Sequence, residues 1–113
     1  MLTANEGEPN SYGAADSVDP EGSISIVTVN RSGASVSPSV ATADFRAFNS
    51  KADALRAAGV RLYGPGASVA QDLEPEYITI ADDGNTAWVT LQENNAIATV
   101  DIAAAKVTAI HPL

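Results

Sequence analysis

The sequence predicts a mainly β protein made of antiparallel four-stranded units of the propeller-blade type, with one short inserted helix. Three observations support this prediction. Short strand-like runs follow one another at close, even spacing in the last third of the chain. Runs of the same kind recur in the first half, at the period of propeller blades. A helical period occurs only near residues 44–58.

The last third, residues 71–113, is predicted to form one complete four-stranded blade. Asp82-Asp83-Gly84-Asn85 indicates a hairpin turn, because Asp-Gly is a strong hairpin signal. Glu93-Asn94-Asn95 supplies the next turn, since Asn tolerates the left-handed backbone that tight turns need. The strand after that turn alternates strictly, which is typical of a half-buried strand. The four predicted strands are YITIA (77–81), TAWVTL (86–91), AIATVDI (96–102) and KVTAI (106–110).

The first part, residues 1–70, is predicted to be an incomplete blade with loop and helix insertions. LTA at residues 2–4 resembles the stub of a strand, and a polar loop runs from Asn5 to Glu21. GSISIVTV at 22–29 alternates cleanly and predicts a strand. The Ser-rich stretch that follows, residues 30–42, is interpreted as an irregular excursion. The remaining strand of this blade is placed at VRLY, residues 60–63.

The inserted helix is predicted over residues 44–58. Phe45, Phe48, Ala52 and Leu55 recur at spacings of three and four, which places them on one face of a helix. Gly59 is a suitable C-terminal stop.

The two halves can be superimposed. LTANEGE aligns with VTLQENN, and SISIVTV aligns with AIATVDI. The chain then holds about one and three quarters blades, as a fragment of a larger propeller, because each four-stranded blade buries its faces only against its neighbours. The polar turns at 5–8 and 92–95 would then face the same rim.

Composition excludes several classes of protein. The chain has 113 residues, a net charge of -8 and no cysteine. Phosphate binding needs clustered Lys and Arg, so nucleic acid is not an expected partner. A chain without cysteine has no disulfide framework and no thiol nucleophile. No stretch is long and apolar enough to span a bilayer, and no signal peptide is present in this segment.

Three runs carry a resemblance to a known family: TANEGEP, FRAFNSKADALRAAGVRLYGPGASVAQDLEPEYI and DDGNTAWVTLQENNAIATVDI. Together they resemble the propeller of the choice-of-anchor I family, which is similar to mesenchyme-specific cell-surface glycoproteins. Some relatives carry alkaline phosphatase-like or phytase/esterase-like labels, and the last blade also resembles surface repeats of the YVTN type. The resemblance implies an extracellular or cell-surface location on bacteria.

Acidic residues on predicted loops are the candidates for chemistry. Carboxylate oxygens suit calcium or magnesium, and if the blade alignment holds several of them meet at one rim. The alternative is that they are solvated turn acids, some of which cap exposed backbone amides. The candidate metal ligands are Glu6, Glu8, Glu74, Glu76 and Glu93, with Asp72 as a further acid nearby in sequence.

No catalytic set is evident from the sequence. His111 is the only histidine, and no serine lies in a G-x-S-x-G context. Tyr77 and Trp88 are interpreted as packing residues of the core or of a blade interface. Two functions remain open: a non-catalytic binding or adhesion segment, with a possible cation dependence, or part of a metal-dependent phosphoesterase. The expected partners are the remaining blades of the propeller or a second copy, since exposed sheet faces attract partners.

Overall fold

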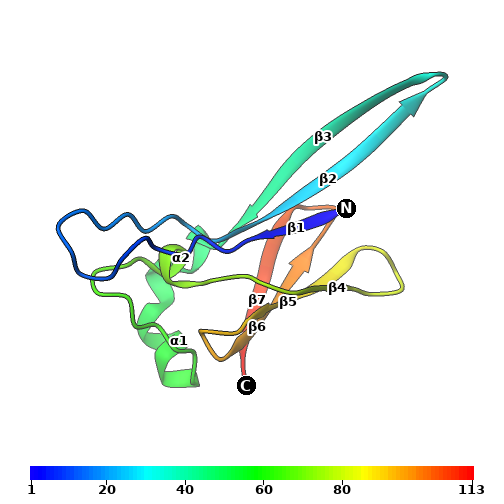
Figure 1. Cartoon of the computed structure of the whole chain (residues 1–113). Coiled ribbons are helices and arrows are strands. Elements are labelled where there is room, and N and C mark those ends of the chain that lie inside the picture. The colour runs from blue at the N-terminus through cyan, green and yellow to red at the C-terminus, as the bar shows by residue number, and fades with distance from the viewer.

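The computed structural model describes all residues, 1–113, as two antiparallel sheets, and three short helical segments connect the first sheet to the second along the chain (Figure 1). One sheet has three strands in the order β1-β2-β3, and the other has four in the order β4-β5-β6-β7. The mainly β prediction is therefore confirmed. The strands are β1 (Leu2–Asn5), β2 (Ser23–Ser32), β3 (Ser35–Asp44), β4 (Ile78–Ile80), β5 (Thr86–Leu91), β6 (Ala96–Asp101) and β7 (Lys106–Pro112). The helical segments are the 3-10 helix η1 (Arg46–Lys51), α1 (Ala52–Ala58) and α2 (Val69–Asp72).

The four-stranded sheet confirms the zigzag predicted for the last third. Each of its strands pairs with the next strand in the chain. In β5, Ala87, Val89 and Leu91 are fully buried and alternate with exposed or half-buried residues. Strand β6 buries every second residue in the same way, starting from Ala96. This alternation places one face of the sheet on the core, as a period of two requires.

The three-stranded sheet corrects two predictions. Residues 30–42, expected to be irregular, lie almost wholly in a long hairpin of β2 and β3, turned at Gly33, which has a φ of 58°. Residues 60–63 form no strand. The stretch SVSPSVAT alternates Val or Pro with Ser, which is strand periodicity, and the Ser content obscured it. Pro38 is tolerated because β3 is an edge strand, where a missing N–H is not needed.

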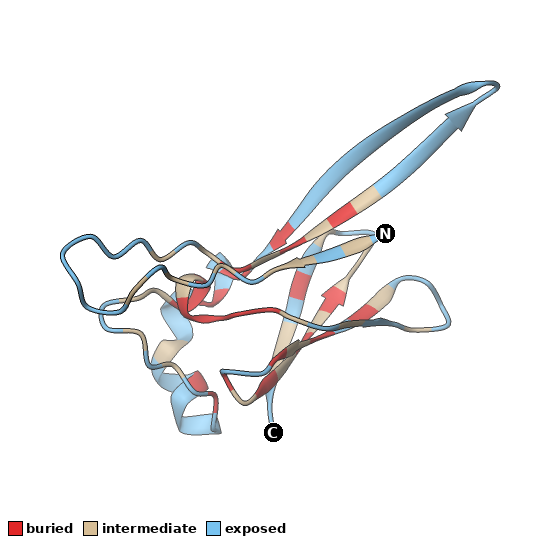
Figure 2. Ribbon diagram, in the orientation of Figure 1, coloured by how far each residue is buried: buried red, intermediate tan, exposed pale blue.

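Most of this hairpin extends beyond the body of the molecule. Strand β1 pairs with β2 only from Ser23 to Ile26, so the remainder of β2 pairs with β3 alone. We call residues 28–40 the arm. Every residue of the arm is exposed (Figure 2).

The predicted helix is present but is divided in two. Residues 46–51 form the 3-10 helix η1, and only 52–58 are α-helical. The predicted face is confirmed, because Phe45, Phe48 and Leu55 are buried. Gly59 ends α1 with a φ of 114°, a left-handed conformation that favours glycine.

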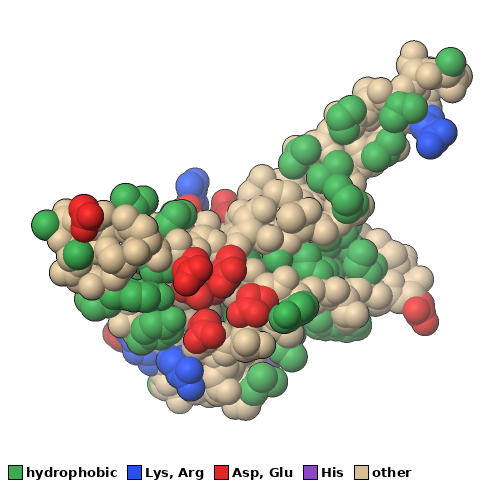
Figure 3. Space-filling model, in the orientation of Figure 1, with side chains coloured by type: hydrophobic (Ala, Val, Ile, Leu, Met, Phe, Trp, Pro, Cys, Tyr) green, Lys and Arg blue, Asp and Glu red, His purple; other side chains and the backbone are tan.

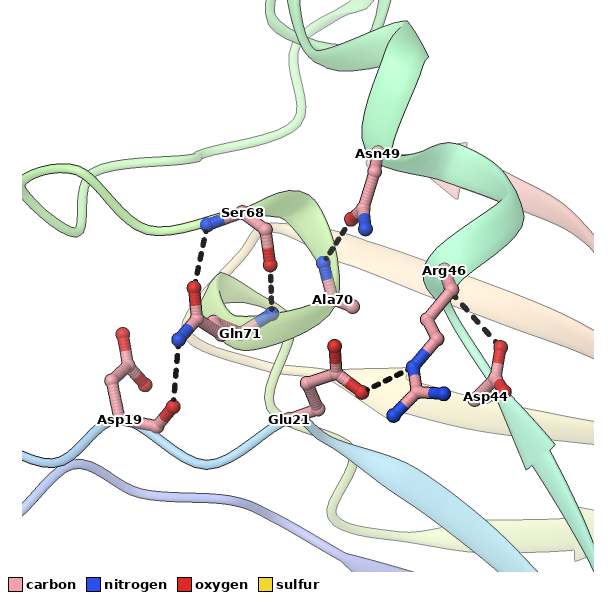
Figure 4. Close-up of polar contacts among 8 residues, drawn as sticks. All are labelled: Asp19, Glu21, Asp44, Arg46, Asn49, Ser68, Ala70 and Gln71. Carbon is pink, nitrogen blue, oxygen red and sulfur yellow. Dashed lines mark hydrogen bonds and ion pairs between the residues drawn. The ribbon is translucent and has the colours of Figure 1, made fainter.

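A second short helix, α2, was not predicted. Ser68 and Gln71 form a capping box in which the Ser68 hydroxyl accepts from the Gln71 N–H at 3.2 Å, and Gln71 Oε1 accepts from the Ser68 N–H at 2.9 Å (Figure 4). Gln71 Nε2 also donates to the Asp19 carbonyl, and Asn49 Oδ1 accepts from the Ala70 N–H. These bonds tie the polar loop, η1 and α2 to one another.

One hydrophobic core unites the two sheets and the helical segments. It includes Ile24 and Ile26 of β2, Phe45, and the buried faces of β5 and β6. Strand β1 contacts β4, and β3 contacts β7, so the edges of the two sheets lie side by side. Both sheets are open, and the propeller ring stays a prediction.

Two aromatic residues lie outside the core, and their packing at a blade interface stays a prediction. Trp88 is 43% exposed and Tyr77 is 70% exposed. Trp88 pairs with Thr79 and Thr99, on the sheet face that points away from the core. A single tryptophan at the centre of a strand is therefore a poor indicator of which face is buried.

Candidate functional site

Five glutamates from three separate segments gather on one face of the body. Glu6 and Glu8 follow β1, Glu74 and Glu76 precede β4, and Glu93 lies in the turn between β5 and β6. Glu6, Glu8 and Glu93 all act electrostatically on Glu74, and Glu6 and Glu93 also act on Glu76. Acidic side chains are seen together on the visible side of the body in Figure 3. We call these five residues the acidic face. The expected meeting of the turns after β1 and β5 therefore takes place.

Glycines allow the segments that carry these glutamates to approach closely. A Cβ on Gly7, which lies between Glu6 and Glu8, would meet the Pro20 carbonyl oxygen at 2.8 Å. A Cβ on Gly22 would collide with the Leu73 carbonyl oxygen. Because neither position has room for a side chain, the backbone of 5–8 packs against 20–22, and 20–22 packs against the segment that holds Glu74.

A buried asparagine fixes the backbone beneath the acidic face. Asn94 is fully buried, and its Oδ1 accepts from the Glu74 N–H at 3.0 Å. Its Nδ2 donates to the Asp72 carbonyl at 2.7 Å and to the Arg61 carbonyl at 2.9 Å. Asn94 thus holds the β5–β6 turn, the Glu74 segment and the chain after α1 in one arrangement. Its side-chain bonds add to the backbone bond that the Arg61 N–H donates to the Asn94 carbonyl at 2.8 Å.

The sequence pattern does not reveal this role of Asn94, because the run Glu93-Asn94-Asn95 indicates only a turn. Asn95 does have the expected left-handed backbone, with a φ of 54°. Asp72 is likewise structural: its carboxylate accepts from the Tyr63 and Gly64 N–H groups. A polar run after an apolar strand does not reveal which of its members turns inward, so no sequence signal separated Asn94 from Asn95.

Glu74 carries the strongest electrostatic perturbation of the acidic face. The residue is only 5% exposed, and burial together with the charges of Glu6, Glu93, Glu8 and Asp72 raises its pKa to about 7. The same causes, burial first and then Glu6 and Glu93, raise the pKa of Glu76. Glu74 therefore changes its charge near neutral pH.

No basic side chain forms an ion pair with a carboxylate of the acidic face. None of its five carboxylates accepts a hydrogen bond, and the two ion pairs of the chain lie elsewhere, at Arg46–Glu21 and Arg56–Asp53. Arg61 reaches this region, but its guanidinium donates to the Glu93 carbonyl at 3.3 Å and not to a carboxylate. The only fully buried side-chain oxygen without a partner is Asp19 Oδ1, so the unpaired Glu74 carboxylate must touch solvent. The acidic face is open to an external cation or basic group.

The carboxylates are not prearranged as a coordination sphere. No three His, Asp or Glu side chains lie in positions that could hold a metal ion together. Glu6, Glu8 and Glu93 are exposed and make no side-chain bonds that would restrain them. Their rotamers can therefore change around the buried Glu74 at the modest entropic cost of ordering surface side chains.

His111 and two short sequence motifs lie outside the acidic face. The His111 ring nitrogen Nε2 is 3.0 Å from Thr99 Oγ1, and this contact joins the neighbouring strands β7 and β6. The Gly64-Pro65-Gly66 turn places the Gly64 N–H on the Asp72 carboxylate. The Asn30-Arg31-Ser32 run lies on the arm.

Comparison with known protein families matches the choice-of-anchor I domain over residues 1–113, the whole chain. No curated protein and no solved structure shows a significant match. None of the helices has the length and apolar character that crossing a bilayer requires.

Proposed function

This chain belongs to the choice-of-anchor I domain family, which indicates a cell-surface associated protein, and from that premise we propose that it is a non-catalytic binding or adhesion segment whose acidic face takes up Ca²⁺ or Mg²⁺. We also propose that the segment is part of a secreted or surface-anchored bacterial β-propeller. The observation that carries it is Glu74, a buried carboxylate that is surrounded by other carboxylates and has no partner.

The arrangement of the sheets supports the propeller part of the proposal. Residues 1–70 contribute three strands and residues 71–113 contribute four, and in both sheets the strands follow chain order. The contacts of β1 with β4 and of β3 with β7 are those expected of neighbouring blades. The glutamate-bearing turns after β1 and β5 then lie on one rim.

The electrostatics of the acidic face support the cation part. Carboxylates that repel one another and lie partly out of water raise the free energy of the folded chain, most of all above the pKa of Glu74. A divalent cation removes this repulsion, and Ca²⁺ accepts the flexible, oxygen-rich geometry that mobile glutamates can offer. Glu74 would bind the cation on the side that faces the protein body. Further oxygen ligands would come from Glu6, Glu8, Glu76 and Glu93, and water would complete the coordination shell.

The test is thermal unfolding in the presence of CaCl₂ or MgCl₂ at pH 8, with NaCl at matched ionic strength as the screening control. A cation at 100 times its Kd stabilises the folded chain by about 2.7 kcal/mol. We expect this gain in stability in the wild type and a much smaller gain in Glu74→Gln. The control variant Asp82→Asn, which removes an exposed acid on the β4–β5 turn, should gain as much as the wild type. The gain should also fall at pH 5.5, where protons occupy Glu74.

Two results would reject the cation role. One is a melting temperature that responds to CaCl₂ no more than to NaCl. The other is an equal gain in Glu74→Gln and in the wild type. No observation of the structure favours the hydrolase alternative.

A further inference from the structure

The arm has one apolar side and one polar side. Cross-strand neighbours share a side of a two-stranded ribbon, and the register pairs Val29 with Pro38 and Arg31 with Val36. Val40 lies on the same side, opposite Val27 at the base of the arm. The other side carries only small polar groups, formed by the pairs Thr28–Ser39, Asn30–Ser37 and Ser32–Ser35. An amphipathic ribbon of this kind is built to lay its apolar side on another surface.

Nothing within the chain covers that apolar side. Val29, Val36 and Val40 are 55%, 56% and 64% exposed. A two-stranded hairpin without a covering surface is only marginally stable in water, and exposed β-branched residues in a row are a ready template for association. We therefore expect a surface of a partner molecule to cover the apolar side of the arm.

The charge distribution identifies the surface that fits the arm. Arg31 is the only charged residue between positions 23 and 43, and it lies on the same side as the valines. The acidic face has no basic partner, and beside it the side chain of Tyr77 is 70% exposed. One surface is thus aliphatic and basic, and the other is aromatic and acidic. In Figure 3 the hydrophobic side chains of the arm, a basic side chain near its tip and the acidic side chains of the body all lie on the same visible side.

We propose that the apolar side of the arm docks on the acidic face of a second copy of this chain, with Arg31 among the glutamates and the valines against Tyr77. Because arm and acidic face lie on one side, two copies that meet face to face can exchange arms, and each arm-to-face contact is then repeated by symmetry. An Arg guanidinium suits this site, since it pairs with carboxylates in a bidentate, directional way. This proposal does not rest on cation binding.

The test is sedimentation velocity over a concentration series, in buffer with EDTA. The arm variant V29D/V40D places charges on the apolar side, and its matched control S37D/S39D adds the same charge to the polar side of the arm. We expect the wild type and S37D/S39D to dimerise. The dimer Kd of V29D/V40D should rise by at least about 100-fold, because the substitutions bury unpaired charge. The face variant Y77K/E93K should weaken the dimer similarly.

Mixing the two defective variants gives the decisive measurement. In a heterodimer of V29D/V40D with Y77K/E93K, the intact arm of one copy meets the intact face of the other, so the mixture should associate although each variant alone is monomeric. The proposal is overturned by a wild type that stays monomeric at every concentration, by equal loss in V29D/V40D and S37D/S39D, or by a mixture that remains monomeric. Circular dichroism of each variant verifies that the body is folded.

Discussion

Replacing Glu74 by glutamine should stabilise the protein at high pH and leave it nearly unchanged at low pH. The substitution keeps the shape of the side chain and removes its charge. The raised pKa, about 7 against the ordinary 4.5, corresponds to a penalty of about 3 kcal/mol when Glu74 is fully ionised. Salt screens the exposed neighbours Glu6, Glu8 and Glu93, so a gain of about 1–3 kcal/mol is expected in ordinary buffers.

The sign of the pH dependence follows from proton binding. A carboxyl group whose pKa is raised by folding holds more protons in the folded chain than in the unfolded chain between pH 4.5 and about 7. The wild type should therefore lose stability as pH rises through that window and reach a plateau above it. The amide introduced by Glu74→Gln cannot titrate, so the contribution of this position becomes flat with pH.

The assay is urea unfolding and thermal melting of both proteins at pH 5 and pH 8, without divalent cations. For a domain of this size about 4 °C of melting temperature corresponds to 1 kcal/mol, so Glu74→Gln should melt roughly 4–12 °C higher than the wild type at pH 8. Asp82→Asn removes an equal charge at the exposed β4–β5 turn and serves as the control. The reasoning is refuted if Glu74→Gln melts no higher than the wild type at pH 8, or if its gain is the same at pH 5.

Three further substitutions test the framework beneath the acidic face. Asn94→Ala removes the donor and acceptor that join three segments, and it should lower the free energy of urea unfolding by about 3 kcal/mol or more. The control Gln92→Ala, at an exposed position, should be nearly neutral. Similar losses of stability in both variants would contradict the role of Asn94. Gly22→Ala drives a Cβ into the Leu73 carbonyl oxygen and should cost more than about 3 kcal/mol, and a normal melting temperature would show that these segments are not in close contact. Leu91→Ala should cost about 2–5 kcal/mol because it opens a cavity under the β5–β6 turn, and a loss below about 1 kcal/mol would place that side chain outside the core.

Local patterns predicted the four-stranded sheet well because its strands are set by alternation and by short turns. Asp83 illustrates this: its carboxylate accepts from the Asn85 and Thr86 N–H groups, which lowers its pKa and closes the hairpin with contacts made within three residues. The same reasoning failed for the arm, where Ser outnumbers Val and no buried face enforces the pattern. It also failed for Val60 to Tyr63, whose strand-like residues are held by Asn94 and Asp72 from distant segments.

The candidate site was predicted in part. The sequence places the five glutamates on predicted loops and turns, and the expected meeting of Glu6 with Glu93 follows from aligning two halves of the chain. What could not be predicted was the difference among them: Glu74 is buried and titrates near neutral pH, while Glu6, Glu8 and Glu93 remain exposed. That difference arises from Gly7, Gly22 and Asn94, whose effects act across segments far apart in the chain.

The sequence by itself determined the class of fold, the acidic character and the positions of the turns in the four-stranded sheet, because each depends on the period, charge or backbone preference of neighbouring residues. Only the tertiary structure decided which polar residues face inward, how close the carboxylates come and which strand surfaces are left uncovered. Burial and Coulomb repulsion depend on distances between segments, and those distances exist only once both sheets have packed on their common core.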